Sequence, residues 1–444
     1  MWSLDTTSEL RVPVGRTGAT KLQYLALGQG TRQHGLIAGK TGSGKSTLFH
    51  VIITNLSLWC SPDQVEFYLV DFKKGVEFKC YATHKLPHAR VIAIESDREF
   101  GLSVLQRVDE ELKRRGDLFR KLGAQDIAGY KRAGGKEPIP RVLLLIDEFQ
   151  ELFVEDDRIS QSAALLLDRI VRQGRAFGIH VLLGSQTLGG AYTLARATIG
   201  QMVVRVALQC NEADAYLIMN EDNPAPRLLS RPGEAIYNDD GGAIQGNSPF
   251  QVVWLPDQTR DEWLAKVQNL GRADLPVGPD ARQRVPTSLR EPIVFEGNAP
   301  ANVRDNLLLR TLLDAKKIHP TSTLHVFLGA PNSIKGPTEA VFRRASGSHL
   351  LVVGQREEAA LGMLAVALVS PAAQHPKNSA RFLVFDCSAP DSAEAKFVEH
   401  VVRAIPHEVK LVRTGEVDDV MMTLAAEQQQ RADATGAAGP ETPR

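Results

Sequence analysis

The chain has 444 residues, which is enough for two to three domains with separate cores. Hydrophobic residues make up 43% of it and charged residues 23%, a composition typical of globular proteins rather than of disordered or membrane-spanning chains. Lysine plus arginine and aspartate plus glutamate number 52 each, so the zero net charge excludes a protein that binds nucleic acid through its overall charge. The start of the chain has no signal-peptide pattern, and we expect a cytoplasmic protein.

The first expected elements are two short strands at 10–14 and 21–27, followed by a buried strand at 36–38. After that strand comes Gly-Lys-Thr-Gly-Ser-Gly-Lys-Ser-Thr, which satisfies the phosphate-loop pattern G-x-x-x-x-G-K-[ST]. A helix is predicted directly after the loop, at 47–58, so strand, loop and helix follow in the order the motif requires. The predicted nucleotide-binding residues are Gly39, Lys40, Thr41, Gly42, Ser43, Gly44, Lys45, Ser46 and Thr47.

The chemistry of this loop indicates ATP and Mg²⁺ as cofactors. Glycines let successive backbone N–H groups turn inward, and the helix that follows adds the positive end of its dipole, so together they hold a phosphate. Lys45 is expected to reach the β- and γ-phosphates, and the Ser46 hydroxyl is expected to bind Mg²⁺.

Further along, strands are predicted at 65–70 and 91–94, and a long helix from Ser96 or Asp97 to Leu122. The next strand begins at Arg141 and runs through five apolar residues into two carboxylates, Asp147 and Glu148. This is the Walker B pattern, in which a buried strand carries an aspartate to the Mg²⁺ ion. Asp147 is therefore the second predicted metal ligand, and Glu148 is predicted to orient or deprotonate the attacking water.

After a helix predicted at 160–177, a strand at 179–184 ends beside Gln186. This amide suits a sensor of the γ-phosphate, and the alternative is a capping residue for the next segment. Arg172 and Arg175 end the preceding helix; either they form a solvated basic face, or one of them is an arginine finger inserted into a neighbouring subunit. A strand at 203–208 and a hairpin between 231 and 255 are expected to close the sheet edge.

These motifs resemble the FtsK/SpoIIIE family of RecA-like motor ATPases, from about residue 10 to 255. The match includes Asp71-Phe-Lys-Lys-Gly-Val-Glu77-Phe78, the stretch from Arg172 to Gln186, and Pro232-Gly-Glu-Ala235. The resemblance implies a RecA-like α/β fold with a central, mainly parallel sheet, ATP hydrolysis, and a ring that is a homohexamer. It also selects Arg175 as the finger acting in trans and Gln186 as the sensor. Thr187 departs from the arginine that is commoner in the family.

The remainder of the chain contains a weak internal repeat. The sequence from His349 to Gly354 matches that from His34 to Gly39, and Val384-Phe-Asp386 matches Leu69-Val-Asp71, both at an offset of 315. Ala359, Ala360 and Leu361 replace the phosphate-loop Gly, Lys and Ser, so this copy should not hydrolyse ATP. The predicted organisation is an ATPase domain at 1–256, a linker at 257–292, a degenerate and partial P-loop-like α/β domain at 293–426, and a disordered tail at 427–444.

Three functions remain open at this stage. The leading prediction, with the other two as alternatives, is a motor that translocates double-stranded DNA, the activity central to the family. The second is a protein-export motor resembling the EccC ATPases of type VII secretion, which would act on a secreted protein and work with a membrane-anchored partner at the inner membrane. The third is a scaffold that binds ATP with negligible turnover.

Overall fold

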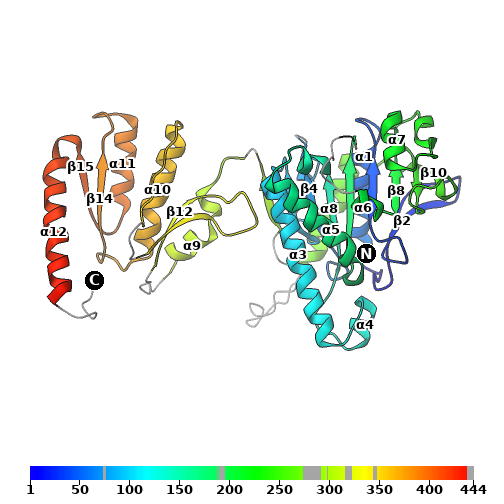
Figure 1. Ribbon diagram of the computed structural model, residues 1–444, viewed down its shortest axis with the longest axis horizontal. Helices are drawn as coiled ribbons and strands as arrows, with labels where there is room; N and C mark the ends of the chain where they lie inside the picture. The colour runs from blue at the N-terminus through cyan, green and yellow to red at the C-terminus, as the bar shows by residue number, and fades with distance from the viewer. Residues whose placement is uncertain are drawn as a thin grey trace. The chain divides into compact units, whose positions relative to one another are not determined.

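The computed structural model describes residues 1–73, 77–187, 189, 196–273, 292–297, 299–315, 323–343 and 348–437. The chain divides into two compact units (Figure 1). Unit 1 comprises Met1–Ala299 and Asn332–Ile334, and unit 2 comprises Pro300–Pro331 and Lys335–Arg444. Across the described residues, no helix combines the length and apolar character needed to cross a membrane.

Unit 1 is built on one mixed sheet. Its described strands, in order across the sheet, are β11 (Ile293–Glu296), β5 (Ala89–Ile94), β4 (Val65–Asp71), β6 (Arg141–Asp147), β7 (Ile179–Ser185), β3 (Gly35–Ala38), β8 (Val204–Ala207), β9 (Glu234–Asn238), β10 (Asn247–Val252), β1 (Leu10–Arg16) and β2 (Leu22–Leu27). All neighbours from β11 to β8 pair in parallel, and the remaining pairs are antiparallel. The predicted α/β fold with a mainly parallel sheet is confirmed.

Helices pack on both faces of this sheet. The described α-helices of unit 1 are α1 (Lys45–Trp59), α2 (Lys79–Thr83), α3 (Arg98–Lys121), α4 (Ile127–Arg132), α5 (Arg158–Gln173), α6 (Arg196–Gly200), α7 (Glu212–Ile218) and α8 (Asp257–Ala273). One hydrophobic core holds side chains of α1 and α8, and the other holds side chains of α3 and α5. Strand β6 alternates between them, with Leu143 and Leu145 in the first core and Leu144 and Ile146 in the second. Because both faces are covered, its apolar run is continuous.

Capping residues set the ends of α3 and α5, the helices of the second hydrophobic core. Asp97 caps α3 by accepting a hydrogen bond from the backbone N–H of Phe100 at 2.8 Å, as one of the two predicted caps would. Asp157 caps α5 in the same way, through the N–H of Ser160 at 2.9 Å. Gly123, with φ of 65°, follows the end of α3, where the left-handed conformation favours glycine.

Two predictions about the edges of the sheet were wrong. The hairpin β9–β10 does not lie at the edge, because β10 pairs with β1 and leaves β2 outermost. Residues 293–296, which were predicted to open the second domain, form β11 and pair in parallel with β5, from Ile293 opposite Val91 to Glu296 opposite Ile94. The aromatic ring of Phe295 also stacks on Phe100 of α3, with 4.1 Å between centroids, which ties this segment to unit 1.

Apart from its first helix, the strands and α-helices described in unit 2 follow the order found in the first half of unit 1, without a counterpart of β3. Its described elements are α9 (Leu307–Leu313), β12 (Thr323–Gly329), β13 (Thr338–Arg343), α10 (Glu357–Ala373), β14 (Arg381–Asp386), α11 (Ala393–Ala404), β15 (Glu408–Arg413) and α12 (Val417–Ala437). The antiparallel pair β12–β13 corresponds to β1–β2, and the parallel pair β14–β15 corresponds to β4–β5. The helices α10, α11 and α12 follow the order of α1, α2 and α3.

The strand expected before Gly354 is absent from the described part of unit 2. Residues 350–353 are not assigned to a strand there, and Leu351 and Val353 are 87% and 86% exposed. The matching strand of unit 1, β3, lies between β7 and β8 and pairs with both. The described part of unit 2 contains no counterparts of those two strands, so the segment lacks the partners that hold β3.

The predicted tail also begins differently. Helix α12 continues to Ala437, past the expected start of disorder at 427. Glu427 forms ion pairs with Arg381 of β14 and, one turn along the helix, with Arg431, and both pairs support the helix at this point. The last residues, 438–444, lie outside the described residues, as does nearly all of the second half of the predicted linker, 274–291.

Candidate nucleotide site

The phosphate loop leaves β3 at Gly39 and enters α1 at Lys45. Gly42 and Gly44 have φ of 78° and 103°, in the left-handed region that glycine tolerates, and these two residues give the loop its curl. The loop is fixed at both sides: the N–H of Lys40 donates to the Gln209 carbonyl at 2.8 Å, and the N–H of Gly233 donates to the Ser43 carbonyl at 2.8 Å. The backbone is therefore held in a cradle before any ligand arrives.

Helix α1 presents a free N-terminus to this cradle. Its N-cap residue is Gly44, no side chain caps it, and its first turn holds no acidic residue. The first N–H groups of a helix have no partner within the helix and carry partial positive charge. Over the 15 residues of α1 this end suits an anion such as a phosphate group.

The Lys45 side chain connects the phosphate loop to the end of β6. Its ammonium contacts the carboxylate of Asp147 and lies 2.9 Å from Oε1 of Glu148. All three residues are buried, with Lys45 only 5% exposed. The structure thus brings together the loop lysine and both carboxylates of the predicted Walker B strand.

Two further residues hold the Glu148 carboxylate in place. Its Oε2 accepts hydrogen bonds from the side-chain amide of Gln150 at 2.8 Å and from the backbone N–H of Gln186 at 3.1 Å. Gln150 in turn accepts a bond from Ser185 Oγ at 2.8 Å. Gln150 and Ser185 were not among the predicted site residues. The only signal in the sequence was that Gln150 lies two residues after Glu148 and that Ser185 directly precedes Gln186.

The backbone and the charge of Glu148 are both unusual. Its φ of 52° lies in the left-handed region, which is uncommon for a residue with a side chain and is frequent at functional sites. Burial raises the pKa of Glu148, but the Lys45 ammonium and the hydrogen bonds from Gln150 and Gln186 outweigh it, so its pKa lies below the usual value. For Asp147 burial prevails over Lys45, and its pKa is raised. Glu148 is thus held as a carboxylate.

Gln186 lies between the loop and the acidic strand end. Its side-chain oxygen accepts a hydrogen bond from Thr41 Oγ1 at 2.9 Å, while its backbone N–H contacts Glu148. An amide in this position can respond to what the phosphate loop holds.

Ser46 and Asp147, the two predicted metal ligands, fit a magnesium site of the type found in nucleotide-binding proteins. There Mg²⁺ keeps several waters and takes only one or two ligands from the protein. Ser46 Oγ donates to Oε1 of Glu77 at 3.0 Å, so an acidic side chain stands next to the hydroxyl. Among the described residues, no three His, Cys, Asp or Glu side chains gather as a direct ligand cluster.

The two arginines lie away from this cluster. Arg175 is exposed in the short 3₁₀ helix at Gly174–Phe177, which precedes β7, whereas Gln186 follows the other end of that strand. Seven strand residues span about 20 Å. Arg172 is paired with Asp168 of its own helix, with Nε 2.8 Å from Oδ2. Arg175 therefore cannot serve the nucleotide site of its own copy.

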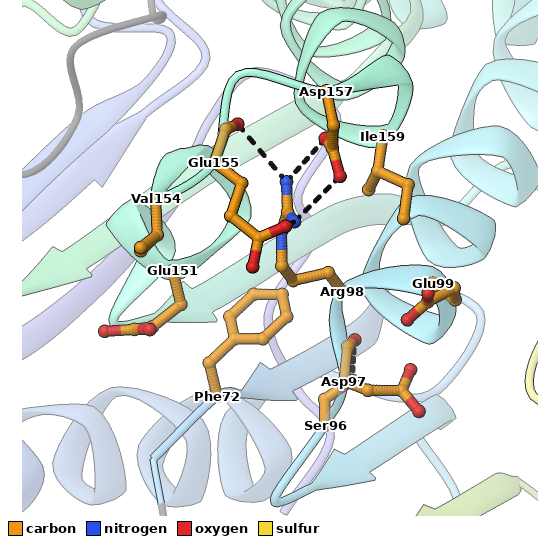
Figure 2. Close-up of a pocket in the computed structure, with 10 residues that line it drawn as sticks. All are labelled: Phe72, Ser96, Asp97, Arg98, Glu99, Glu151, Val154, Glu155, Asp157 and Ile159. Carbon is orange, nitrogen blue, oxygen red and sulfur yellow. Dashed lines mark hydrogen bonds and ion pairs between the residues drawn. The ribbon is translucent and has the colours of Figure 1, made fainter.

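A pocket of about 400 Å³ lies beside the ends of β4 and β5 (Figure 2). Figure 2 shows Arg98 held between Glu155 and Asp157, with Phe72 below it; Nη1 is 2.9 Å from Oε2 of Glu155, and Nη2 is 2.7 Å from Oδ1 of Asp157. These pairs join the first turn of α3 to the start of α5. None of the predicted site residues lines this pocket.

Comparison with known proteins agrees with this geometry. Residues 5–189 match the model of the FtsK/SpoIIIE family. Over 231 residues the chain is 34% identical to the ESX-5 secretion system protein EccC5 of Mycobacterium marinum, and over 278 residues it is 29% identical to the DNA translocase FtsK of Streptococcus agalactiae. The cytoplasmic domain of the type VII secretion ATPase EccC from Thermomonospora curvata shares the fold, with a TM-score of 0.65 at 20% identity.

The extent of each match differs. The EccC5 alignment covers 49% of this chain and 16% of EccC5. The FtsK alignment covers 60% of this chain and 32% of FtsK. The structural match to Thermomonospora curvata EccC covers 99% of this chain and 51% of the other. The chain thus spans only a part of each relative.

Proposed function

We propose that this chain binds ATP with Mg²⁺, hydrolyses it and uses the energy for translocation, because residues 5–189 match the model of the FtsK/SpoIIIE family. The observation that carries the proposal is the Lys45 ammonium, which joins the carboxylates of Asp147 and Glu148 beside the open N-terminus of α1. These are the groups that phosphoryl transfer to water requires: a phosphate cradle, a cation, a metal ligand and a base.

Each residue has one task in this proposal. The backbone from Gly39 to Thr47 holds the phosphates and Lys45 neutralises them, while Ser46 and Asp147 hold Mg²⁺, which balances charge on the β- and γ-phosphates. Glu148 orients the attacking water and takes its proton, because its carboxylate is ionised and fixed by Gln150. Gln186 senses the γ-phosphate through Thr41. Arg175 completes the site of a neighbouring copy, which requires a ring, and we propose a homohexamer.

We further propose that the cargo is a secreted polypeptide. Supporting this choice, the fold of type VII secretion EccC is shared over both units of this chain, and unit 2 repeats the elements of unit 1. In that setting unit 2 is a degenerate copy: Ala359 and Ala360 stand in the first turn of α10 with Glu357 and Glu358, a poor place for phosphates. The protein would work in the cytoplasm, at the inner membrane through a membrane-anchored partner.

Double-stranded DNA is the second candidate cargo. It is favoured by the identity with a streptococcal DNA translocase over 278 residues. The zero net charge supplies no general attraction to DNA, so any contact would have to be local.

One assay separates these functions. The ATPase rate is measured alone and with linear duplex DNA at low and at raised salt. A rate that DNA leaves unchanged supports the polypeptide motor, whereas stimulation by DNA that fades with salt would establish the DNA translocase instead. Absence of turnover in every condition, together with intact ATP binding, would leave the non-motor scaffold.

A further inference from the structure

Strand β4 brings an acidic residue into the nucleotide site that none of the Walker motifs contains. Asp71 ends β4 and is paired in parallel register with Asp147 of β6. Side chains at paired positions of neighbouring parallel strands lie on the same face of a sheet, so both carboxylates stand on the side where Lys45 lies. Asp71 is 1% exposed and interacts electrostatically with Asp147, Glu77 and Lys45.

The hydrogen bonds of Asp71 are incomplete. One oxygen, Oδ1, accepts from the backbone N–H of Lys73 at 2.9 Å. The other, Oδ2, is buried and finds no hydrogen-bond partner in the part of the chain that the structure describes. A buried carboxylate oxygen without a partner is costly, and a native site that keeps one normally offers it to a ligand.

Glu77, in the turn between β4 and α2, is a second acidic residue at this place and interacts electrostatically with Lys45. Its Oε1 accepts the hydrogen bond from Ser46 Oγ at 3.0 Å, and its Oε2 lies 3.4 Å from Nε2 of His50, one turn further along α1. The His50 ring is fixed by Tyr81, whose hydroxyl is 2.7 Å from Nδ1. Glu77 is thus oriented toward the hydroxyl that is expected to bind the metal.

Around this point the acidic side chains outnumber the ammonium groups, and burial raises the pKa of Asp71 to about 7. Asp71, Glu77, Asp147 and Glu148 surround one ammonium, that of Lys45. A triphosphate would add further negative charge. The arrangement therefore calls for a divalent cation, and it holds more carboxylates than Mg²⁺ takes as direct ligands in such sites.

We propose that Glu77 and Asp71 complete the Mg²⁺ side of the nucleotide site as positioning residues, Glu77 through the Ser46 hydroxyl and both through metal-bound water. This inference rests on the proposed ATP-binding function. Partners of this kind, one step removed from the ion, typically change metal affinity 10- to 100-fold when they are replaced.

The test measures binding rather than turnover. The Kd of a non-hydrolysable ATP analogue is determined in EDTA and in excess Mg²⁺. The Kd in EDTA divided by the Kd in Mg²⁺ reports how strongly nucleotide binding depends on the metal. In Glu77→Gln and Asp71→Asn we expect that ratio to fall at least about tenfold, with the Kd in EDTA unchanged within about twofold. Asp63→Asn, which removes an exposed carboxylate near the opposite end of β4, should keep the wild-type ratio.

A stability measurement accompanies the binding data. Because Asp71→Asn removes a buried carboxyl group that lacks a full set of partners, the Tm in EDTA should rise, while Glu77→Gln should leave it unchanged because that side chain is 40% exposed. A wild-type metal ratio in both variants, or a lower Tm for Asp71→Asn, would overturn the inference and leave the proposed function standing. A wild-type protein that binds no nucleotide in either buffer would refute both.

Discussion

The ammonium of Lys45 contacts the carboxylate of Asp147 directly, although 102 residues separate the two in the chain. The same ammonium lies 2.9 Å from Glu148, and none of the three is exposed. A triphosphate in the loop must therefore compete with two carboxylates for one cation. Without nucleotide the lysine stabilises the protein, and with nucleotide it is expected to turn to the phosphates.

Replacement of Lys45 by alanine should affect binding and stability together. The variant loses the cation that holds the phosphates, and it leaves two buried carboxylates without a positively charged partner, which costs about 3 kcal/mol in the free energy of unfolding. A fluorescent ATP analogue and urea unfolding measure the two effects. Lys40→Ala, an exposed lysine of the same loop, is the control and should keep wild-type stability. Tight ATP binding by Lys45→Ala would contradict the role given to this residue.

Replacement of Gln150 by leucine should lower turnover without lowering affinity. The amide holds Oε2 of Glu148 but is not expected to touch the nucleotide. We expect kcat to fall about tenfold, against about 100-fold for Glu148→Gln, in which the base itself is lost. Steady-state ATPase assays with matched binding measurements separate the two. Equal kcat values for Gln150→Leu and the wild type would show that Glu148 needs no such support.

Arg175→Ala should keep nucleotide binding and lose about 10³-fold in turnover, because an arginine finger acts only on the transition state. Since Arg175 cannot serve its own site, mixing this variant with inactive Lys45→Ala should restore part of the activity, because an Arg175→Ala site next to a Lys45→Ala subunit receives an arginine from that neighbour. Arg172→Ala, whose side chain already pairs with Asp168, serves as the control and should hydrolyse ATP normally. Normal turnover by Arg175→Ala alone would remove the reason for a ring.

Acidic pH should destabilise unit 1 through its buried histidines. Burial lowers the pKa of His88 from 6.5 to about 3 and that of His34 to about 4. In the unfolded chain both bind a proton below about pH 6.5, while in the folded protein neither does until much lower pH. Stability is therefore complete above pH 6.5 and falls by about 1.4 kcal/mol per histidine for each pH unit below it.

The measurement is urea unfolding at pH 7.5 and 5.5 followed by tryptophan fluorescence, which reports on unit 1 because all four tryptophans lie there. His88→Gln should show a loss of stability smaller by about 1.4 kcal/mol than the wild type over this interval. Exposed His400→Gln should show the wild-type loss. Identical losses in His88→Gln and the wild type would mean that His88 does not take part.

The sequence predicted those parts of the site that depend on short patterns. The phosphate loop and β6 combine a local motif with a continuous apolar run, so Lys45 and Asp147 could be identified before the fold was known. Asp71 could not be assigned to the site in this way. Its place depends on β4 pairing with β6 rather than with β3, and such long-range pairing is not encoded in any local period of the chain.

The weaker predictions failed where neighbours decide the structure. Residues 350–353 have the same apolar pattern as β3, but a strand also needs partners for its backbone. Residues 293–296 were predicted to begin the second domain, but they pair in parallel with β5 at the edge of the sheet of unit 1. Both segments have the apolar pattern of a strand. Whether each one forms a strand, and in which sheet, depends on a neighbouring strand with free backbone groups.

The exposed aliphatic side chains at 350–353 should make the protein prone to aggregation. A segment with two strongly exposed aliphatic side chains, Leu351 and Val353, is the kind of surface through which chains aggregate. Concentrated samples should scatter light increasingly with time, starting from unit 2. A single lysine in place of Val353 should keep the solution clear.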